Sequence, residues 1–178
     1  MSNRIFIGID VGLDGGIVTL DSAGKIIDQR VMPVVAIGKG RKIDLAMLDE
    51  FFGHAEDDYL GGISATVIIE NPGGHAPSAA GLRSMTYSFA VCEALCVANG
   101  LRYHEVMAQK WQKEFWSKPS MPKGVKFDTK AAALAECKKL WPGNEWRQVG
   151  KSGKLLKNAH TGVTDAALIC EYGRRKNL

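Results

Sequence analysis

The segment Arg4-Ile-Phe-Ile-Gly-Ile-Asp10 decides the fold, and the glycine-rich turn Val11-Gly-Leu-Asp-Gly-Gly16 follows it directly. A short apolar run with β-branched side chains is typical of a strand that is buried on both faces. An ionised carboxylate at the end of such a run is costly to bury unless it is paired. Asp10 is therefore the first candidate functional residue.

Two further strands are expected after this turn, over residues 17–21 and 25–31, with Ser22-Ala-Gly24 between them. Short glycine-containing connections are typical of antiparallel neighbours, so residues 4–31 predict a three-stranded antiparallel meander. Residues 32–43 are expected to form a loop with a small group of basic side chains. Asp44 is expected to cap a helix whose apolar positions have helical spacing.

The rest of the chain alternates strands and helices. We expect strands over 65–70 and 101–106, helices over 78–98, 129–140 and 162–174, a short helix around Trp111, and loops over 116–127 and 144–160. This order predicts an α/β fold with a mixed five-stranded sheet, in which the meander is joined by two parallel strands and flanked by helices. The length of 178 residues predicts one domain over 1–178.

Composition excludes several classes of protein. Hydrophobic residues make up 46% of the chain and charged residues 24%, as in soluble globular proteins. No apolar run approaches the roughly 18 residues of a membrane span, and the N-terminal segment does not resemble a secretory signal. The four cysteines form no Cys-x-x-Cys pair, so we expect reduced core thiols in a cytoplasmic protein.

Charge is distributed unevenly along the chain. The overall net charge of +4 divides into −5 over residues 1–100 and +9 over residues 101–178. A basic half of this kind is typical of a surface that binds a polyanion, although a solvated basic surface is the commoner explanation.

Three acidic residues lie where an acid is costly: Asp10 and Glu70 end apolar strands, and Asp165 precedes the apolar run of the last helix. Because ligands of open α/β sheets collect beyond the carboxyl ends of the strands, we expect these side chains to converge there. Close carboxylates repel one another and suit Mg²⁺ or Mn²⁺. Two such ions about 3.5–4 Å apart support phosphodiester hydrolysis. Taken singly, Asp10 is explained by a turn and Asp165 by a helix dipole, but the three together favour a metal site.

A family resemblance joins these residues. Ile7-Gly-Ile-Asp10-Val-Gly12 before a meander looks like the opening of RNase H-like folds, and Ile68-Ile-Glu70 with Asp165-Ala-Ala-Leu-Ile resembles the acid order of the RuvC family of Holliday junction resolvases. The segment His160-Thr-Gly-Val-Thr-Asp165 is similar to the C-terminal motif of phage-type members. The resemblance covers essentially the whole chain.

The resemblance implies a homodimeric endonuclease that cuts four-way DNA junctions and leaves 5′-phosphate and 3′-hydroxyl ends. It implies two Mg²⁺ ions per site, replaceable by Mn²⁺, with Asp10, Glu70 and Asp165 as catalytic metal ligands. His160 matches a histidine that some relatives carry near the fourth ligand position. The chain departs from the family at Thr161 and Gly162, where many members have another acid, and at 71–75, where an aromatic wedge is absent.

Basic residues suggest where DNA binds. Lysines alternate with aromatic residues over 110–130, and others lie in the loop just before His160, a composition that suits backbone neutralisation and base stacking. Trp111 and Phe115 lie four apart on one helix face, so we expect these two aromatic residues in the core. The predicted DNA-binding residues are Arg83, Lys110, Lys113, Lys151, Lys154 and Lys157. The helix over 78–98 is apolar on more than one face, which indicates burial in a core or in a dimer interface.

Other functions compete with this one. Another RNase H-like nuclease, acting on an RNA–DNA hybrid or on branched nucleic acid, fits the same acids, and a catalytically silent junction-binding protein fits them less well. The opening also resembles the phosphate motif of actin-like and sugar-kinase-like nucleotide binders, but that fold needs two lobes and more than about 300 residues. Gly150-Lys151-Ser152 lacks the spacing of a P-loop, so we expect no nucleotide cofactor.

Overall fold

The structure is a computed structural model that describes residues 4–60, 64–73, 78–150 and 152–178. In chain order its elements are β1 (Arg4–Asp10), β2 (Gly16–Asp21), β3 (Ile26–Val31), β4 (Val34–Ile37), β5 (Gly40–Ile43), α1 (Leu45–Leu60), β6 (Ser64–Asn71), α2 (Ala79–Ala98), β7 (Arg102–Met107), α3 (Ala108–Phe115), α4 (Thr129–Leu140), β8 (Arg147–Val149), β9 (Leu155–Ala159) and α5 (Thr161–Lys176).

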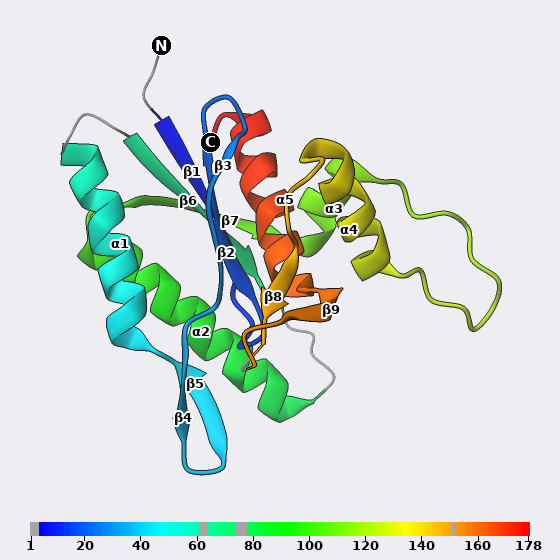
Figure 1. Ribbon diagram of the computed structural model, residues 1–178, viewed down its shortest axis with the longest axis horizontal. Coiled ribbons are helices and arrows are strands. Elements are labelled where there is room, and N and C mark those ends of the chain that lie inside the picture. Colours follow the sequence, from blue (N-terminus) through cyan, green and yellow to red (C-terminus); the bar gives the residue numbers. More distant parts are fainter. Residues whose placement is uncertain (1–3, 61–63, 74–77, 151) are drawn as a thin grey trace.

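The central sheet has the strand order β3-β2-β1-β6-β7 (Figure 1). Strands β1, β2 and β3 are antiparallel neighbours, and β6 and β7 run parallel to β1. The predicted mixed sheet, a meander joined by two parallel strands, is confirmed. Because β1 lies in the middle and is paired on both sides, its carboxyl end lies at the centre of one edge of the sheet.

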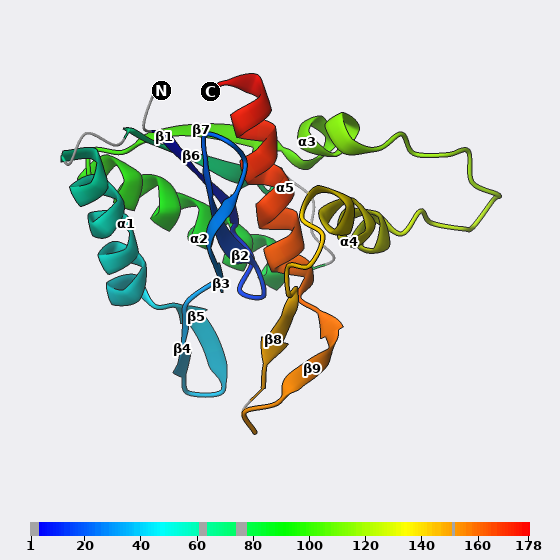
Figure 2. The same ribbon diagram turned by 45° about the horizontal axis from the view of Figure 1, so that its top comes forward.

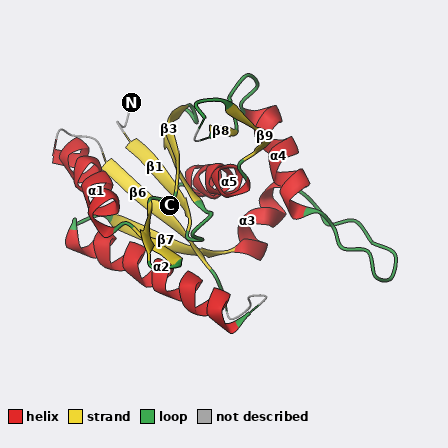
Figure 3. Ribbon diagram, turned by 60° about the horizontal axis from the view of Figure 1, so that its bottom comes forward, coloured by secondary structure: helices red, strands yellow, loops and turns green. Residues whose placement is uncertain are grey.

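Strand β1 separates two apolar cores. Ile5, Ile7 and Ile9 point to one face, where α1 and α2 pack, and Phe6 points to the other face, where α5 packs. Figure 3 shows α1 and α2 on one side of the sheet and α3, α4 and α5 on the other. This two-residue alternation explains why the segment is apolar throughout, since both faces of β1 are covered.

Helix α5 lies directly on the backbone of β1. A Cβ atom at Gly8 would overlap the carbonyl oxygen of Ala166 and the backbone nitrogen of Cys170. On the same face, Gly16 approaches the backbone of Val163 at the start of α5. The helix can come this close only because these strand positions lack side chains.

Two segments predicted as loops form β-hairpins. Residues 32–43 contain β4 and β5, paired from Val34↔Ile43 to Ile37↔Gly40, and Ile43 is buried in the core. Residues 144–160 contain β8 and β9, with Val149 opposite Leu155. The prediction was wrong at both places because the strands are only three to five residues long and stand among glycines and basic residues, so the segments show no extended alternation.

Helix boundaries agree closely with the sequence pattern. Ser78 caps α2 by accepting a hydrogen bond from the Gly81 N–H at 3.0 Å, and Asp128 caps α4 by accepting from the N–H groups of Lys130 and Ala131. The cap at Asp44 is also confirmed, because its carboxylate accepts from the Met47 N–H at 3.2 Å. Helix α1 extends beyond the predicted apolar segment to Leu60.

The four cysteines are free and buried, as predicted for core thiols. Burial raises the pKa of the Cys92 thiol to about 12 and raises the pKa values of the other three thiols as well.

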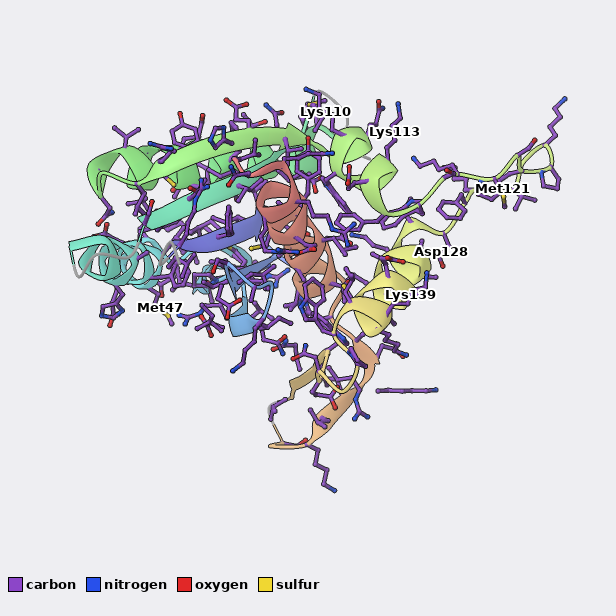
Figure 4. All side chains as sticks on the ribbon, turned by 90° about the horizontal axis from the view of Figure 1, so that it is seen from above. Met47, Lys110, Lys113, Met121, Asp128 and Lys139 are labelled. Carbon is purple, nitrogen blue, oxygen red and sulfur yellow. The ribbon has the colours of Figure 1, made fainter. Side chains whose placement is uncertain are left out.

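Within the described ranges, no helix has the length and apolar character needed to cross a bilayer. Between α3 and α4, residues 116–128 form a long arm with Met121 near its tip, away from the body (Figure 4).

The contact between α5 and β1 gives a stability prediction. Gly8→Ala should lower the free energy of unfolding by about 3 kcal/mol or more, at the upper end of overpacking costs, because the obstructing atoms belong to backbone. Urea unfolding followed by circular dichroism measures this change. Gly40→Ala is the control: its Cβ would meet only the Ile37 carbonyl oxygen at 3.7 Å, so it should change stability by less than about 0.5 kcal/mol. Equal effects of the two substitutions would contradict the packing described here.

Candidate active site

Two carboxylates meet at the carboxyl edge of the sheet. Asp10 ends β1 and Glu70 lies near the end of β6, and the parallel register of these strands, which pairs Ile9 with Ile69, places the two acids side by side. The Gly12 N–H donates to Asp10 Oδ1 at 3.2 Å, which fixes the orientation of this carboxylate. The sequence prediction that the two acids share one edge is therefore confirmed in its geometry.

Asp165 is brought to the same place by α5. It is buried, with only 7% of the residue exposed, in the second turn of a helix whose first turn contacts the loop after β1 through the bridge Gly15↔Gly162. The charge of Asp165 contributes to raising the pKa of Glu70, and the charge of Asp10 contributes to raising the pKa of Asp165. The three predicted acids thus form one electrostatically coupled group.

A lysine that the sequence prediction did not include occupies this group. Lys130, in the first turn of α4, forms an ion pair with Asp165. Its burial opposes ionisation, yet the charges of Asp165, Asp10 and Glu70 raise the pKa of its ammonium. A cation in the first turn of a helix opposes the helix dipole, and this unfavourable placement was the signal available in the sequence.

The raised pKa values of the three carboxyls show that Lys130 does not fully balance their negative charge. Burial is the largest cause in each case: it raises the pKa of Asp10, raises that of Glu70 to about 8, and raises that of Asp165 to about 6. Lys130 lowers all three pKa values without restoring ordinary ones. One ammonium therefore compensates only partly for three carboxylates, and a cation of higher charge would be held strongly here.

Trp111 positions Glu70. The indole Nε1–H of this fully buried tryptophan donates to Glu70 Oε2 at 3.0 Å and acts to lower the pKa of the carboxyl, against the effect of burial. The sequence indicated Trp111 as a core residue on α3, which is confirmed, but the spacing gave no sign of its hydrogen bond. The Trp111 side chain thus connects the apolar core between α5 and the sheet to the candidate active site.

The loop after β1 contributes a second charged pair. Asp14 is paired with Arg41 of β5 through two hydrogen bonds of 3.0 and 3.1 Å, which lower the pKa of the aspartate. His160 caps α5, accepting the Val163 N–H on Nδ1 at 3.3 Å, and burial lowers its pKa while Asp14 and Asp10 raise it. His160 lies beside the acids, and its Nδ1 atom serves the helix cap, while its catalytic role stays a prediction.

The donor set suits a hard divalent cation. Three carboxylates from three elements offer oxygen atoms, which are the ligands that Mg²⁺ and Mn²⁺ prefer. Across the part of the chain that the structure describes, no three acidic, histidine or cysteine side chains stand arranged to hold one ion together. Lys130 is paired with Asp165 Oδ2 instead, so a metal ion held by that oxygen would replace this ion pair.

The predicted DNA-binding residues lie in three places. Arg83 on α2 lines a hollow of about 300 Å³ together with Arg41 and Lys42 of the β4–β5 hairpin. Lys154 lies in the turn just before β9 and Lys157 lies on β9, where it lines a groove of about 450 Å³ that Lys130 also lines. Lys110 and Lys113 lie on α3 (Figure 4). Lys151 lies outside the described residues.

The overall fold matches that of known structures. No sequence family matches the chain, and no curated protein is similar to it in sequence. Its fold matches RuvC of T. thermophilus in complex with a Holliday junction substrate at a TM-score of 0.60, with 9% identity over 97% of this chain and 96% of that chain. The chain has the RuvC fold. A second structure, Thermus thermophilus RuvC, matches at a TM-score of 0.52 and 10% identity over the same shares.

The RuvC fold confirms the resemblance expected from the acid order, at the level of architecture. In this chain, Asp10 lies on β1, Glu70 on β6 and Asp165 on α5. The chain therefore shares its overall fold with the known structures, although only about one residue in ten is identical.

The pKa of Glu70 gives a pH prediction for the metal-free protein. Because its pKa is raised from 4.5 to about 8, the folded state holds a proton that the unfolded state releases between these values. Stability should therefore fall as pH rises through this window, by at most roughly 1.4 kcal/mol per pH unit. Glu70→Gln keeps a neutral side chain, so it should be the more stable protein at pH 8 and should lose most of the slope above pH 6.5.

Urea unfolding in EDTA at pH 6.5 and pH 8 measures this slope. Glu50→Gln, which neutralises an exposed acid on α1, is the matched control and should keep the wild-type slope. The same pH slope in wild type and Glu70→Gln would show that Glu70 is not buried as described.

Proposed function

We propose that the chain is a divalent-metal-dependent nuclease that resolves four-way DNA junctions, leaving 5′-phosphate and 3′-hydroxyl ends. The convergence of Asp10, Glu70 and Asp165 at one edge of the sheet carries this proposal, because metal-assisted phosphodiester hydrolysis needs a cluster of carboxylates that holds cations against a phosphate. The RuvC neighbour bound to a Holliday junction substrate supports branched DNA as the substrate class.

Asp10, Glu70 and Asp165 would hold the metal ions, which when bound activate a water molecule and stabilise the leaving oxygen. The chain's own contribution is preorganisation. The Gly12 N–H orients Asp10, and the Trp111 indole orients Glu70. Lys130, released from Asp165, would face the incoming phosphate from α4 with its charge intact.

Basic residues on both sides of the acids would hold the DNA backbone. Arg41, Lys42 and Arg83 lie on the α2 side, and Lys154 and Lys157 lie on the β8–β9 hairpin. Phosphate contacts of this type position a nucleic acid without reading its sequence. Binding should therefore weaken steeply as salt concentration rises.

A homodimer is part of the proposal, and α2 supports it. Among the described residues of this helix only Ser88, Cys92 and Cys96 are buried. Its solvent side carries an apolar stripe at alternating spacings of three and four residues, formed by Tyr87, Ala90, Ala94 and Val97. Small residues in such a stripe let two helices approach closely. Two copies of α2 packed together would bury the face that the sequence predicted to be buried.

Asp10→Asn is the direct test of the nuclease. It should lower the rate of four-way junction cleavage in Mg²⁺ by at least about a hundredfold, the scale of losing one electrostatic stabiliser, while junction binding in Ca²⁺ is kept. Cleavage is measured on a mobile junction, a matched duplex and an RNA–DNA hybrid with denaturing gels. Asp14→Asn is the control, because it removes a neighbouring carboxylate that pairs with Arg41 and should retain cleavage.

Paired symmetric nicks in the junction alone support junction resolution. Cleavage of the hybrid instead would replace this function with that of another RNase H-like nuclease. Binding without cleavage in both Mg²⁺ and Mn²⁺ would rule out both enzymes.

The dimer is tested by a charge in the α2 stripe. Ala94→Glu should weaken the dimer at least about a hundredfold, because two like charges then face each other in an apolar contact. Analytical ultracentrifugation measures the association. Ala135→Glu, at an exposed alanine of α4, is the control and should remain dimeric. A monomeric wild type at micromolar concentration, or an unchanged Ala94→Glu dimer, would contradict the proposed interface.

A further inference from the structure

The tip of the β8–β9 hairpin exposes aliphatic side chains to solvent. Val149 is 64% exposed, Leu155 is 45% exposed and Leu156 is 50% exposed. Single exposed aliphatics are ordinary on a protein surface, but this one short hairpin carries three of them. The candidate active site does not explain their exposure.

Strand pairing and backbone hydrogen bonds join the described residues at the tip. Val149 and Leu155 are directly opposed across the two strands, so their side chains lie together on one face. The Gly150 N–H donates to the Lys154 carbonyl at 2.8 Å and the Gly153 N–H to the Gly150 carbonyl at 2.9 Å, which closes the turn. On the other face Leu156 lies against Gly150. The hairpin thus ends in an aliphatic pair on a backbone that is already hydrogen-bonded.

The surroundings of this aliphatic pair are basic. The sequence from residue 147 to 159 contains no acidic residue, and Lys154 and Lys157 flank Leu155 and Leu156. Lys157 lines the groove that leads to Lys130 of the candidate active site. A partner that is negatively charged outside and apolar inside complements such a tip. Nucleic acid, with phosphates around stacked bases, has this character. A basic partner would find no acidic side chain to pair with on this hairpin.

The hairpin projects from the site itself. Strand β9 ends at Ala159, and the next residue is His160 at the start of α5. Leu155 and His160 are five residue steps apart along extended chain, a reach of about 17 Å at 3.3 Å per residue. Figure 2 shows β8–β9 and β4–β5 projecting on the same side of the body, separated from each other. DNA held between them would present its bases to the hairpin tip.

We propose that Val149 and Leu155 insert between unstacked bases at the branch point of DNA bound in this site, while Lys154 and Lys157 hold the phosphates beside it. This inference rests on the proposed function. Apolar side chains inserted at a base step replace part of the stacking they disrupt. A branch point requires less disruption than a continuous duplex, because its bases are already interrupted in their stacking. The hairpin would therefore favour branched over linear DNA.

Fluorescence of 2-aminopurine tests the insertion. The probe is placed at the branch point of an immobile four-way junction, and binding is followed in Ca²⁺ without cleavage. Wild type should raise the fluorescence because the base is unstacked, and V149T/L155N should lose this rise. Since no charge is removed, the slope of log affinity against log salt concentration should stay unchanged. K154Q/K157Q should instead reduce that slope by about 2 and keep the fluorescence rise at low salt.

I27N is the matched control, because Ile27 is an aliphatic residue 56% exposed on the edge strand β3. It should behave as wild type. Thermal unfolding of V149T/L155N should match wild type within a few degrees, since the substituted side chains are exposed, and L156N provides a second variant on the other face of the same tip with the fluorescence rise retained.

The outcomes separate the two proposals. A wild type that binds and cleaves the junction without a fluorescence rise, or a V149T/L155N variant that keeps the rise, overturns the insertion and leaves the nuclease in place. A wild type that binds neither junction nor duplex overturns both. A change of oligomeric state in V149T/L155N, measured by ultracentrifugation, assigns the tip to a protein contact and also overturns the insertion.

Discussion

The close approach of α5 to β1 is the constraint on which the rest of the structure depends. Gly8 allows the backbone of the last helix to lie on the central strand, and the bridge between Gly15 and Gly162 fixes the start of that helix beside the loop after β1. Residues separated by about 150 positions in the chain thus become neighbours. Without this contact Asp165 would lie apart from Asp10 and Glu70, and the edge of the sheet would carry two acids instead of three.

Charge balance is the second organising feature. The buried carboxylates cannot all ionise without a cation, and Lys130 provides one from a helix that the site would otherwise not need. The same demand for positive charge extends outward, since the Asp14–Arg41 pair connects the loop after β1 to the β4–β5 hairpin. Positive charge therefore surrounds the acids at two distances: Lys130 lies among them, and the basic residues of the β4–β5 hairpin lie farther out.

Much of this arrangement could be predicted from the sequence, and the exceptions have physical reasons. The strands around Asp10 and Glu70 can be recognised from continuous apolar runs, and the helix cap at Asp44 from its residue type. The hairpins could not be found in this way, because each pairs two strands of only three to five residues, which are too short to show a periodic pattern. Lys130 and Trp111 reach the acids only through tertiary packing, so no spacing along the chain reveals their contacts. Lys151 remains a prediction, as do the roles of the basic residues on α3.

The cysteine placement has a practical consequence for spectroscopy. All four thiols are buried, and two donate to backbone carbonyls, Cys170 to Phe6 at 2.9 Å and Cys137 to Thr164 at 3.4 Å. A thiol that is buried with a raised pKa forms little thiolate and reacts slowly with maleimides and iodoacetamides. A single cysteine introduced at an exposed position, such as Ser152→Cys on the β8–β9 connection, can therefore be labelled selectively. The folded chain accepts one dye or spin label without prior removal of its native cysteines.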